Sequence, residues 1–124
     1  MGHNTGLYHS LTVKENLLFF SKISGDKNLG INTSIKTWGL EAYQNQTTLN
    51  LSQGLSIRAG LARAFLSDAP ILLLDEPSAN LDDEFKKVLL AELKIHSSKK
   101  YIFIATHEPS LFHELSPEVI NLCL

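Results

Sequence analysis

The stretch Ile71-Leu72-Leu73-Leu74-Asp75-Glu76-Pro77 decides the fold class of this 124-residue chain. Its apolar residues form a short run between Pro70 and an acidic pair, which is typical of a strand buried on both faces of a parallel sheet. A second strand is expected at residues 101–105, directly followed by Thr106-His107. Because functional side chains gather at the carboxyl ends of parallel strands, the candidate functional residues stand at these two strand ends.

Helical periodicity accounts for most of the remaining sequence. Thr12 and Glu15 have the spacing of a capping box, which predicts a helix at about residues 13–23. A last strand is expected at residues 118–122. The alternation of strands and helices predicts an α/β class with a parallel sheet. The other expected helices lie at about residues 31–42, with the stripe Ile31, Ile35, Trp38 and Ala42; at about residues 53–67, after the N-cap Ser52; and around Phe85, Leu89 and Leu93.

Composition excludes several classes of protein. With 44% hydrophobic residues, 19% charged residues and a net charge of -2, the chain resembles an ordinary globular protein. It has no basic stripe, so nucleic acid is not an expected partner. The single cysteine, Cys123, excludes an internal disulfide. With no apolar run of about 20 residues and no secretory signal, we expect a cytoplasmic chain that reaches a membrane only through a partner.

The acidic pair Asp75-Glu76 has two readings from its position alone. Placing two carboxylates against a buried strand costs desolvation, so the pair requires a cation or a hydrogen-bond donor nearby. A strand-end Asp that orients Mg²⁺, beside a Glu that orients or deprotonates water, is a recurring arrangement in phosphoryl transfer. Alternatively, the two carboxylates only cap the turn that follows at Pro77.

Several sequence blocks, in one order along the chain, resemble the motifs of ABC-type ATPases. The segment 11–17 is similar to the one that opens the ABC helical subdomain. The resemblance implies the C-terminal portion of a P-loop NTPase fold, with a helical subdomain and a partial parallel sheet with flanking helices. Residues 1–50 would form the Q-loop remnant and helical subdomain, and residues 51–124 the signature helix and half of a RecA-like catalytic core. The other matching blocks are the signature at 51–55, with Arg58 after it; Walker B at 71–77; the D-loop at 78–82; and the switch histidine at 106–107.

The resemblance also implies roles at the strand ends. Asp75 would help to hold Mg²⁺ that arrives with ATP, and Glu76 would polarise the attacking water. His107 would contact the γ-phosphate and that water.

Other residues would act across a head-to-tail dimer of ABC domains. Ser52 and Gly54 would close on ATP bound by the second domain, and Asp82 would couple the two sites. Ser52 offers a hydroxyl at a helix start whose free N–H groups attract anions. Gln53 and Leu55 depart from the commonest signature motif.

The glutamine expected in the Q-loop falls on His3. Histidine can still hydrogen-bond near the metal and water, although it titrates near neutral pH. The segment 2–8 resembles the haem-exporter ATP-binding subunits of cytochrome c maturation. An exporter ATPase for a drug, lipid or peptide is the alternative subfamily, and a His3 without any role is the alternative for that residue.

The sequence contains no G-x-x-x-x-G-K-[ST] motif. This Walker A loop would hold the β- and γ-phosphates. We therefore expect a fragment, a split reading frame, or one half of a domain that pairs with another polypeptide. Alone, the chain is expected to bind ATP poorly, to be inactive, and to leave apolar sheet edges and faces uncovered.

The expected function is that of an ATP-hydrolysing subunit of an ABC membrane exporter, bound to transmembrane permease subunits on the inner face of the membrane. The alternative is a non-catalytic remnant or half-domain that serves as a binding partner of a membrane or ABC subunit.

Overall fold

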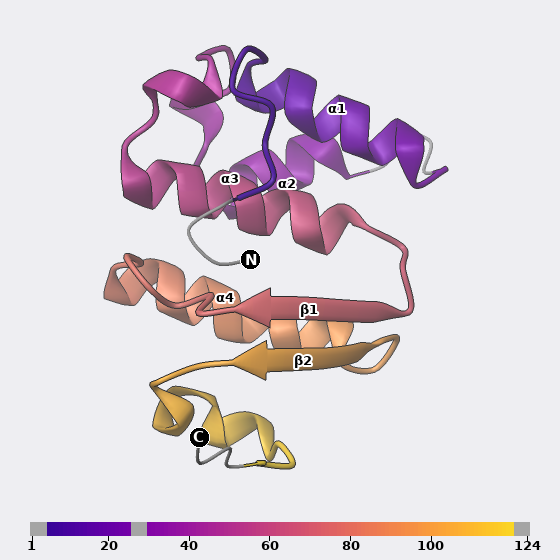
Figure 1. Ribbon diagram of the computed structural model, residues 1–124, viewed down its shortest axis with the longest axis vertical. Helices are drawn as coiled ribbons and strands as arrows, with labels where there is room; N and C mark the ends of the chain where they lie inside the picture. Colours follow the sequence, from indigo (N-terminus) through magenta and orange to yellow (C-terminus); the bar gives the residue numbers. More distant parts are fainter. Residues whose placement is uncertain (1–4, 26–29, 121–124) are drawn as a thin grey trace.

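The computed structural model describes residues 5–25 and 30–120 (Figure 1). A helical region comes first, and a small sheet with its helix follows, which confirms the α/β class. The 3-10 helices are η1 (Glu41–Tyr43), η2 (Thr48–Asn50) and η3 (Pro109–Leu115). The helices and strands are α1 (Val13–Ile23), α2 (Ile31–Thr37), α3 (Gln53–Leu66), β1 (Ile71–Asp75), α4 (Asp83–His96) and β2 (Tyr101–Ala105).

Local sequence signals explain where the longer helices begin. The Thr12 hydroxyl accepts a hydrogen bond from the Glu15 N–H at 3.1 Å, and the Glu15 carboxylate accepts one from the Thr12 N–H at 2.9 Å. These bonds satisfy donors that a helix start leaves free, which confirms the predicted capping box. They also hold the pKa of the Glu15 carboxyl below its usual value, because the charged form accepts them better.

The two strands form a parallel pair in the register Ile71 opposite Tyr101 through Asp75 opposite Ala105. Helix α4 connects them and lies behind both in Figure 1, so it covers one face of the sheet. On that side Leu72 and Leu74 of β1 are buried.

The opposite face of the sheet is apolar and exposed. Ile71 is 54% exposed, Leu73 68%, Tyr101 74% and Phe103 59%. The prediction of a strand buried on both faces is therefore wrong for the described residues, because they supply a covering helix on one side only. The predicted uncovered apolar face is confirmed.

Two further predictions about elements are wrong. The second helix ends at Thr37 rather than near residue 42, because Gly39 takes a left-handed φ of 62° after the C-cap residue Trp38. Residues 118–120 form no strand in the described part of the chain, where β1 and β2 pair only with each other. A strand needs a neighbour for its hydrogen bonds, and Val119 and Ile120 are exposed instead. Residues 121–122 of this expected strand lie outside the described residues.

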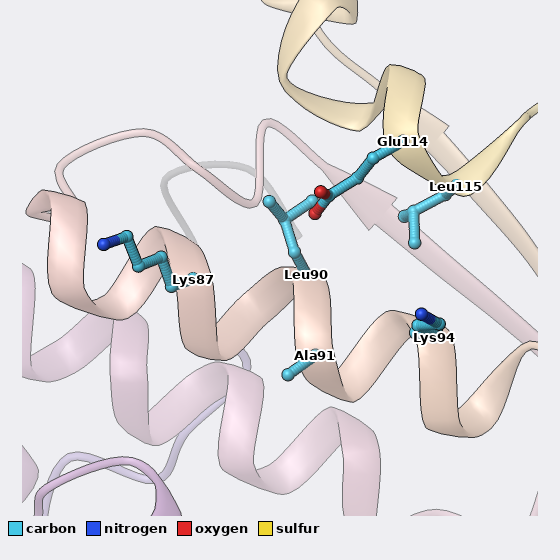
Figure 2. Close-up of a pocket in the computed structure, with 6 residues that line it drawn as sticks. All are labelled: Lys87, Leu90, Ala91, Lys94, Glu114 and Leu115. Atoms are coloured by element: carbon cyan, nitrogen blue, oxygen red, sulfur yellow. The ribbon is translucent and has the colours of Figure 1, made fainter.

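Beyond β2 the chain returns to α4 through η3, which buries Phe112. A hollow of about 220 Å³ remains between the two elements (Figure 2). It is lined by Lys87, Leu90, Ala91, Lys94, Glu114 and Leu115.

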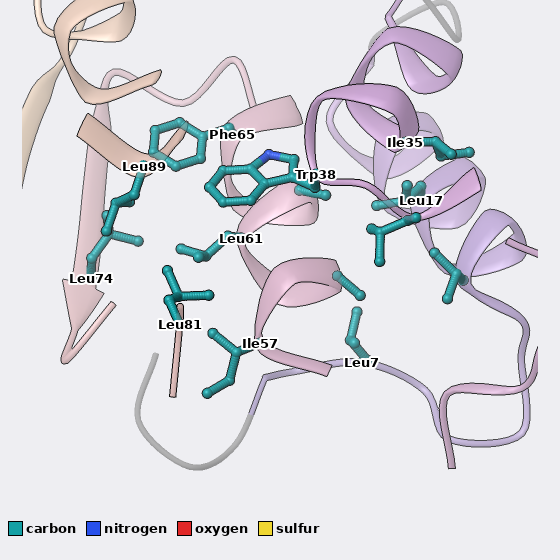
Figure 3. Close-up of a cluster of buried hydrophobic side chains, with 14 of the residues drawn as sticks. Leu7, Leu17, Ile35, Trp38, Ile57, Leu61, Phe65, Leu74, Leu81 and Leu89 are labelled. Carbon is teal, nitrogen blue, oxygen red and sulfur yellow. The ribbon is translucent and has the colours of Figure 1, made fainter. Parts of the chain in front are cut away.

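Helix α3 lies at the centre of the molecule. It packs against α1 and α2, and it also reaches the layer of β1 and α4. Figure 3 shows Leu17 and Ile35 on one side of this helix and Leu74 and Leu89 on the other. The Trp38 ring stacks on Phe65 of α3 with centroids 6.0 Å apart. One continuous core therefore joins the helical region to the sheet.

Arg58 of α3 links the end of α2 to α4. Its Nη1 donates to the Trp38 carbonyl at 3.2 Å, and its guanidinium carbon lies 4.0 Å from the centre of the Phe85 ring. Gly39 packs closely against Arg58 and Phe85. A Cβ at Gly39 would lie 2.7 Å from Phe85 Cζ and 2.9 Å from Arg58 Nη1.

We predict that Gly39→Ala destabilises the chain more than Gly25→Ala does. Both glycines have a left-handed φ, and this conformation costs an alanine about 1–2 kcal/mol at either position. A Cβ at Gly25 meets nothing within 4 Å, whereas at Gly39 it displaces Phe85 and Arg58. Such overpacking adds about 1–3 kcal/mol. Urea unfolding measures the free energy of unfolding of both variants. Equal losses of this free energy would contradict the close contact at Gly39.

Candidate functional site

The ends of β1 and β2 bring Glu76 and His107 together. The Glu76 N–H donates to the Ala105 carbonyl at 2.8 Å, which extends the strand ladder by one bond. His107 Nε2 then lies 3.4 Å from Glu76 Oε1. Glu76 has a φ of 50°, which is uncommon for a residue with a Cβ and is often found at functional sites.

This pair is open to solvent. The His107 side chain is 97% exposed and that of Glu76 is 32% exposed. Exposed ion pairs contribute about 0–1 kcal/mol, so the contact cannot by itself fix the imidazole. The place of His107 must be set by the loop that carries it.

Asp75 is the last residue of β1 and is exposed. The described residues contain no group of three or more His, Cys, Asp or Glu side chains that could hold a metal ion. Mg²⁺ is commonly held by one or two carboxylates together with water and substrate phosphates, rather than by a cage of protein ligands. A single strand-end carboxylate fits that mode of binding. His3, the other expected metal-site residue, lies outside the described residues.

The turn after β1 is held mainly by main-chain bonds. The Glu76 carbonyl accepts from the Ala79 N–H at 3.1 Å, and the Ser78 carbonyl accepts from the Leu81 N–H at 3.2 Å. Asp82 then caps α4, because its Oδ1 accepts from the Phe85 N–H at 3.0 Å. In the described part of the chain, the side-chain cap after β1 thus comes from Asp82, and not from Asp75 or Glu76.

Ser52 and Gly54 lie at the start of α3. The Ser52 hydroxyl accepts from the Leu55 N–H at 3.3 Å and is the N-cap, as predicted. A Cβ at Gly54 would lie 3.4 Å from the Asn80 carbonyl, so the α3 start touches the turn after β1. The residues of the expected signature and D-loop are thus neighbours within one chain.

A hollow of about 300 Å³ lies beside the first turn of α3. It is lined by Thr5, His9, Thr48, Leu49, Leu51, Gln53, Ser56 and Ile57.

Sequence reasoning missed two polar residues that shape this region. Asn16 is fully buried and accepts from the Tyr8 N–H at 2.7 Å while it donates to the Tyr8 carbonyl at 3.0 Å, which fixes the loop before α1. Its place three positions after Val13, on the buried face, was the available signal. Glu108 accepts from the buried Ser78 hydroxyl at 3.0 Å, and only its position next to His107 pointed to it.

The family profile for ABC transporters matches residues 1–79, which is more than half of the chain. The chain belongs to the ABC transporter family. Among its relatives, the cytochrome c biogenesis ATP-binding export protein CcmA of Paracoccus denitrificans is 37% identical over 107 residues, which cover 86% of this chain and 50% of that protein. The ABC transporter ATP-binding protein NatA of Bacillus subtilis is 36% identical, with 98% of this chain and 51% of that protein covered.

Solved structures of ABC proteins share the fold. The ATP-binding cassette MJ0796, solved as a dimer in a post-hydrolysis state with ADP and Pi, matches with a TM-score of 0.70 and 27% identity over 86% of this chain and 50% of that one. An ATP-binding subunit of an ABC transporter matches with a TM-score of 0.75 at 24% identity, over 82% of this chain and 44% of that one. The chain therefore spans about half the length of these ABC proteins. Within its described residues, no helix has the length and apolar character to cross a membrane.

We predict that Asp82→Ala lowers the free energy of unfolding by about 1 kcal/mol, because it removes the N-cap of α4. Asp82→Asn keeps an oxygen that can accept from the Phe85 N–H, so this variant should retain most of the stability. Chemical denaturation of the three proteins tests the assignment. Equal losses for alanine and asparagine would show that the charge, and not the cap, stabilises the helix.

Proposed function

We propose that this chain is the catalytic C-terminal part of an ATP-binding subunit of an ABC membrane exporter. The contact between Glu76 and His107 at the ends of two parallel strands carries this proposal. A carboxylate and an imidazole 3.4 Å apart, both open to solvent, can act together on one water molecule and one phosphate group.

Each strand-end residue has a separate role in the proposed hydrolysis. Glu76 orients the attacking water and accepts its proton, and His107 contacts the γ-phosphate and the same water. Asp75 would hold Mg²⁺ that arrives with ATP. When bound, this ion neutralises charge that develops on the phosphates.

Ser52, Gly54 and Asp82 are proposed to act on a second ABC domain in a head-to-tail dimer. The contact between Gly54 and Asn80 supports a common surface for the signature start and the turn that leads to Asp82. Helix α3 is 14 residues long and starts at that surface, where its free N–H groups would attract a phosphate. The dimeric state of MJ0796 with ADP and Pi is a property of that protein and serves here as precedent.

The catalytic unit also needs a Walker A loop, which the sequence does not contain. We propose that a segment carrying this loop, in the same polypeptide or in another, covers the exposed face formed by Ile71, Leu73, Tyr101 and Phe103. In this assembly residues 1–50 form the helical subdomain with the Q-loop segment, and residues 51–124 form half of the catalytic core. This exposed face equally favours the second candidate, a non-catalytic half-domain that only binds an ABC or membrane subunit.

Haem export for cytochrome c biogenesis is the finer proposal for the transported substrate. It is supported by 37% identity to CcmA, but NatA at 36% and the spermidine/putrescine import protein PotA of Spiroplasma citri at 34% are close behind. In each case the subunit would bind transmembrane permease subunits at the inner face of the membrane.

We predict that the chain alone shows no measurable binding of Mg·ATP by calorimetry, because the N–H cradle and lysine of the Walker A loop are missing. Adding a polypeptide that carries this loop, such as the N-terminal half of the Paracoccus CcmA, should create both binding and ATPase activity. Micromolar binding by the chain alone would show that the loop is dispensable. A stable mixture with binding but without turnover would favour the non-catalytic half-domain.

In that mixture, Glu76→Gln should lower kcat by about 10²–10⁴-fold, since the amide can orient water but cannot accept its proton. ATP binding should stay unchanged. Glu84→Gln, in the first turn of α4, is the matched control and should retain full activity. Steady-state phosphate release and calorimetry separate the two effects, and an active Glu76→Gln variant would remove Glu76 from the mechanism.

A further inference from the structure

Glu108 joins the two loops that leave the sheet. Its Oε2 accepts from the Ser78 hydroxyl at 3.0 Å, and its Oε1 lies 3.6 Å from Lys86 Nζ of α4. Its own N–H donates to the Thr106 hydroxyl at 2.9 Å. Glu108 therefore contacts the turn after β1, the helix behind the sheet and the loop that carries His107.

The bond to Ser78 is the strongest of these restraints. Ser78 is 1% exposed, so without Glu108 its hydroxyl would be left without an acceptor at a position that solvent does not reach. An unsatisfied buried hydroxyl costs about 1–3 kcal/mol. The contact with Lys86 adds less, because the Glu108 side chain is 52% exposed and the pair is screened by solvent.

His107 depends on this restraint because its side chain is 97% exposed and meets Glu76 at 3.4 Å. The loop from Thr106 to Glu108 is short, so a displacement of Glu108 moves the imidazole beside it. Ser78 stands two positions after Glu76 in the turn that starts at β1. The hydrogen bond between Glu108 and Ser78 thus fixes the loop that carries His107 relative to the turn that carries Glu76.

We propose that Glu108 is a positioning residue that holds the His107 imidazole against Glu76 through its bond to Ser78. The contribution of this bond to turnover rests on the proposed ATPase function, while the positioning itself does not. Glu108 would not touch the substrate.

Positioning can be measured in the full chain without ATP, by NMR of the His107 ring. In the parent protein Glu76→Gln should shift the His107 ring signals, because it removes a charge 3.4 Å away. In the Glu108→Ala background, Glu76→Gln should shift the His107 ring signals by less than half as much. Ser78→Ala should have the same effect, since it removes the other partner of the bond.

Two controls separate positioning from general damage. Glu108→Gln keeps an oxygen for the Ser78 hydroxyl and should restore most of the shift, although it weakens the pair with Lys86. Glu114→Ala, an exposed carboxylate on η3, should behave like the parent protein. The proposal would be overturned if Glu76→Gln shifted the His107 ring signals as much in folded Glu108→Ala and Ser78→Ala chains as in the parent protein. Loss of folding in both variants would overturn it too, because the bond would then support the whole chain.

The ATPase activity of this chain mixed with a polypeptide that carries the Walker A loop is the second measurement. There Glu108→Ala should lower kcat on the order of tenfold with the KM for ATP unchanged, as expected when a reacting group is misplaced. A raised KM with unchanged kcat would contradict positioning. If the assembly proves inactive, the proposed function fails while the NMR result still decides the role of Glu108.

Discussion

The burial of α3 on two sides is the constraint on which the rest of the structure depends. One side of this helix packs on α1 and α2, and its other side reaches the layer of β1 and α4. Leu61, Ala62 and Phe65 are buried between them. Without α3 neither layer could cover its apolar surface, because two strands and one helix bury too little to be stable alone.

This arrangement also positions the candidate site. Since α3 starts beside the turn after β1, the packing that buries its middle brings Gly54 to the Asn80 carbonyl. The strand pair adds the second element of the site, because parallel strands end at the same edge and place Glu76 beside His107. Residues far apart in sequence thus meet through backbone packing, and not through strong attraction between their side chains.

Two observations concern what lies on the exposed face of the sheet: the exposure of its side chains, and the share of its relatives' length that the chain spans. Leu73 and Phe103 expose more than half of their apolar side chains, whereas Leu72 and Leu74 on the other face are buried. The chain spans about half the length of CcmA and NatA. A further segment packed on this face would give these side chains the burial that apolar strand residues of a parallel sheet usually have.

The sequence by itself determined where α1 and α3 begin and which chemical types stand at the strand ends. Thr12 and Ser52 are the N-caps of α1 and α3, as predicted. Such caps can be predicted because the side chain bonds to an N–H group only three positions away. The family followed from short motifs in order. Which face of β1 is buried, where α2 ends and how Glu108 reaches Ser78 were decided by the tertiary structure. The Glu108 bond joins residues 30 positions apart, and the Arg58 bond to Trp38 at the end of α2 joins residues 20 positions apart. Short-range patterns carry no information about such contacts.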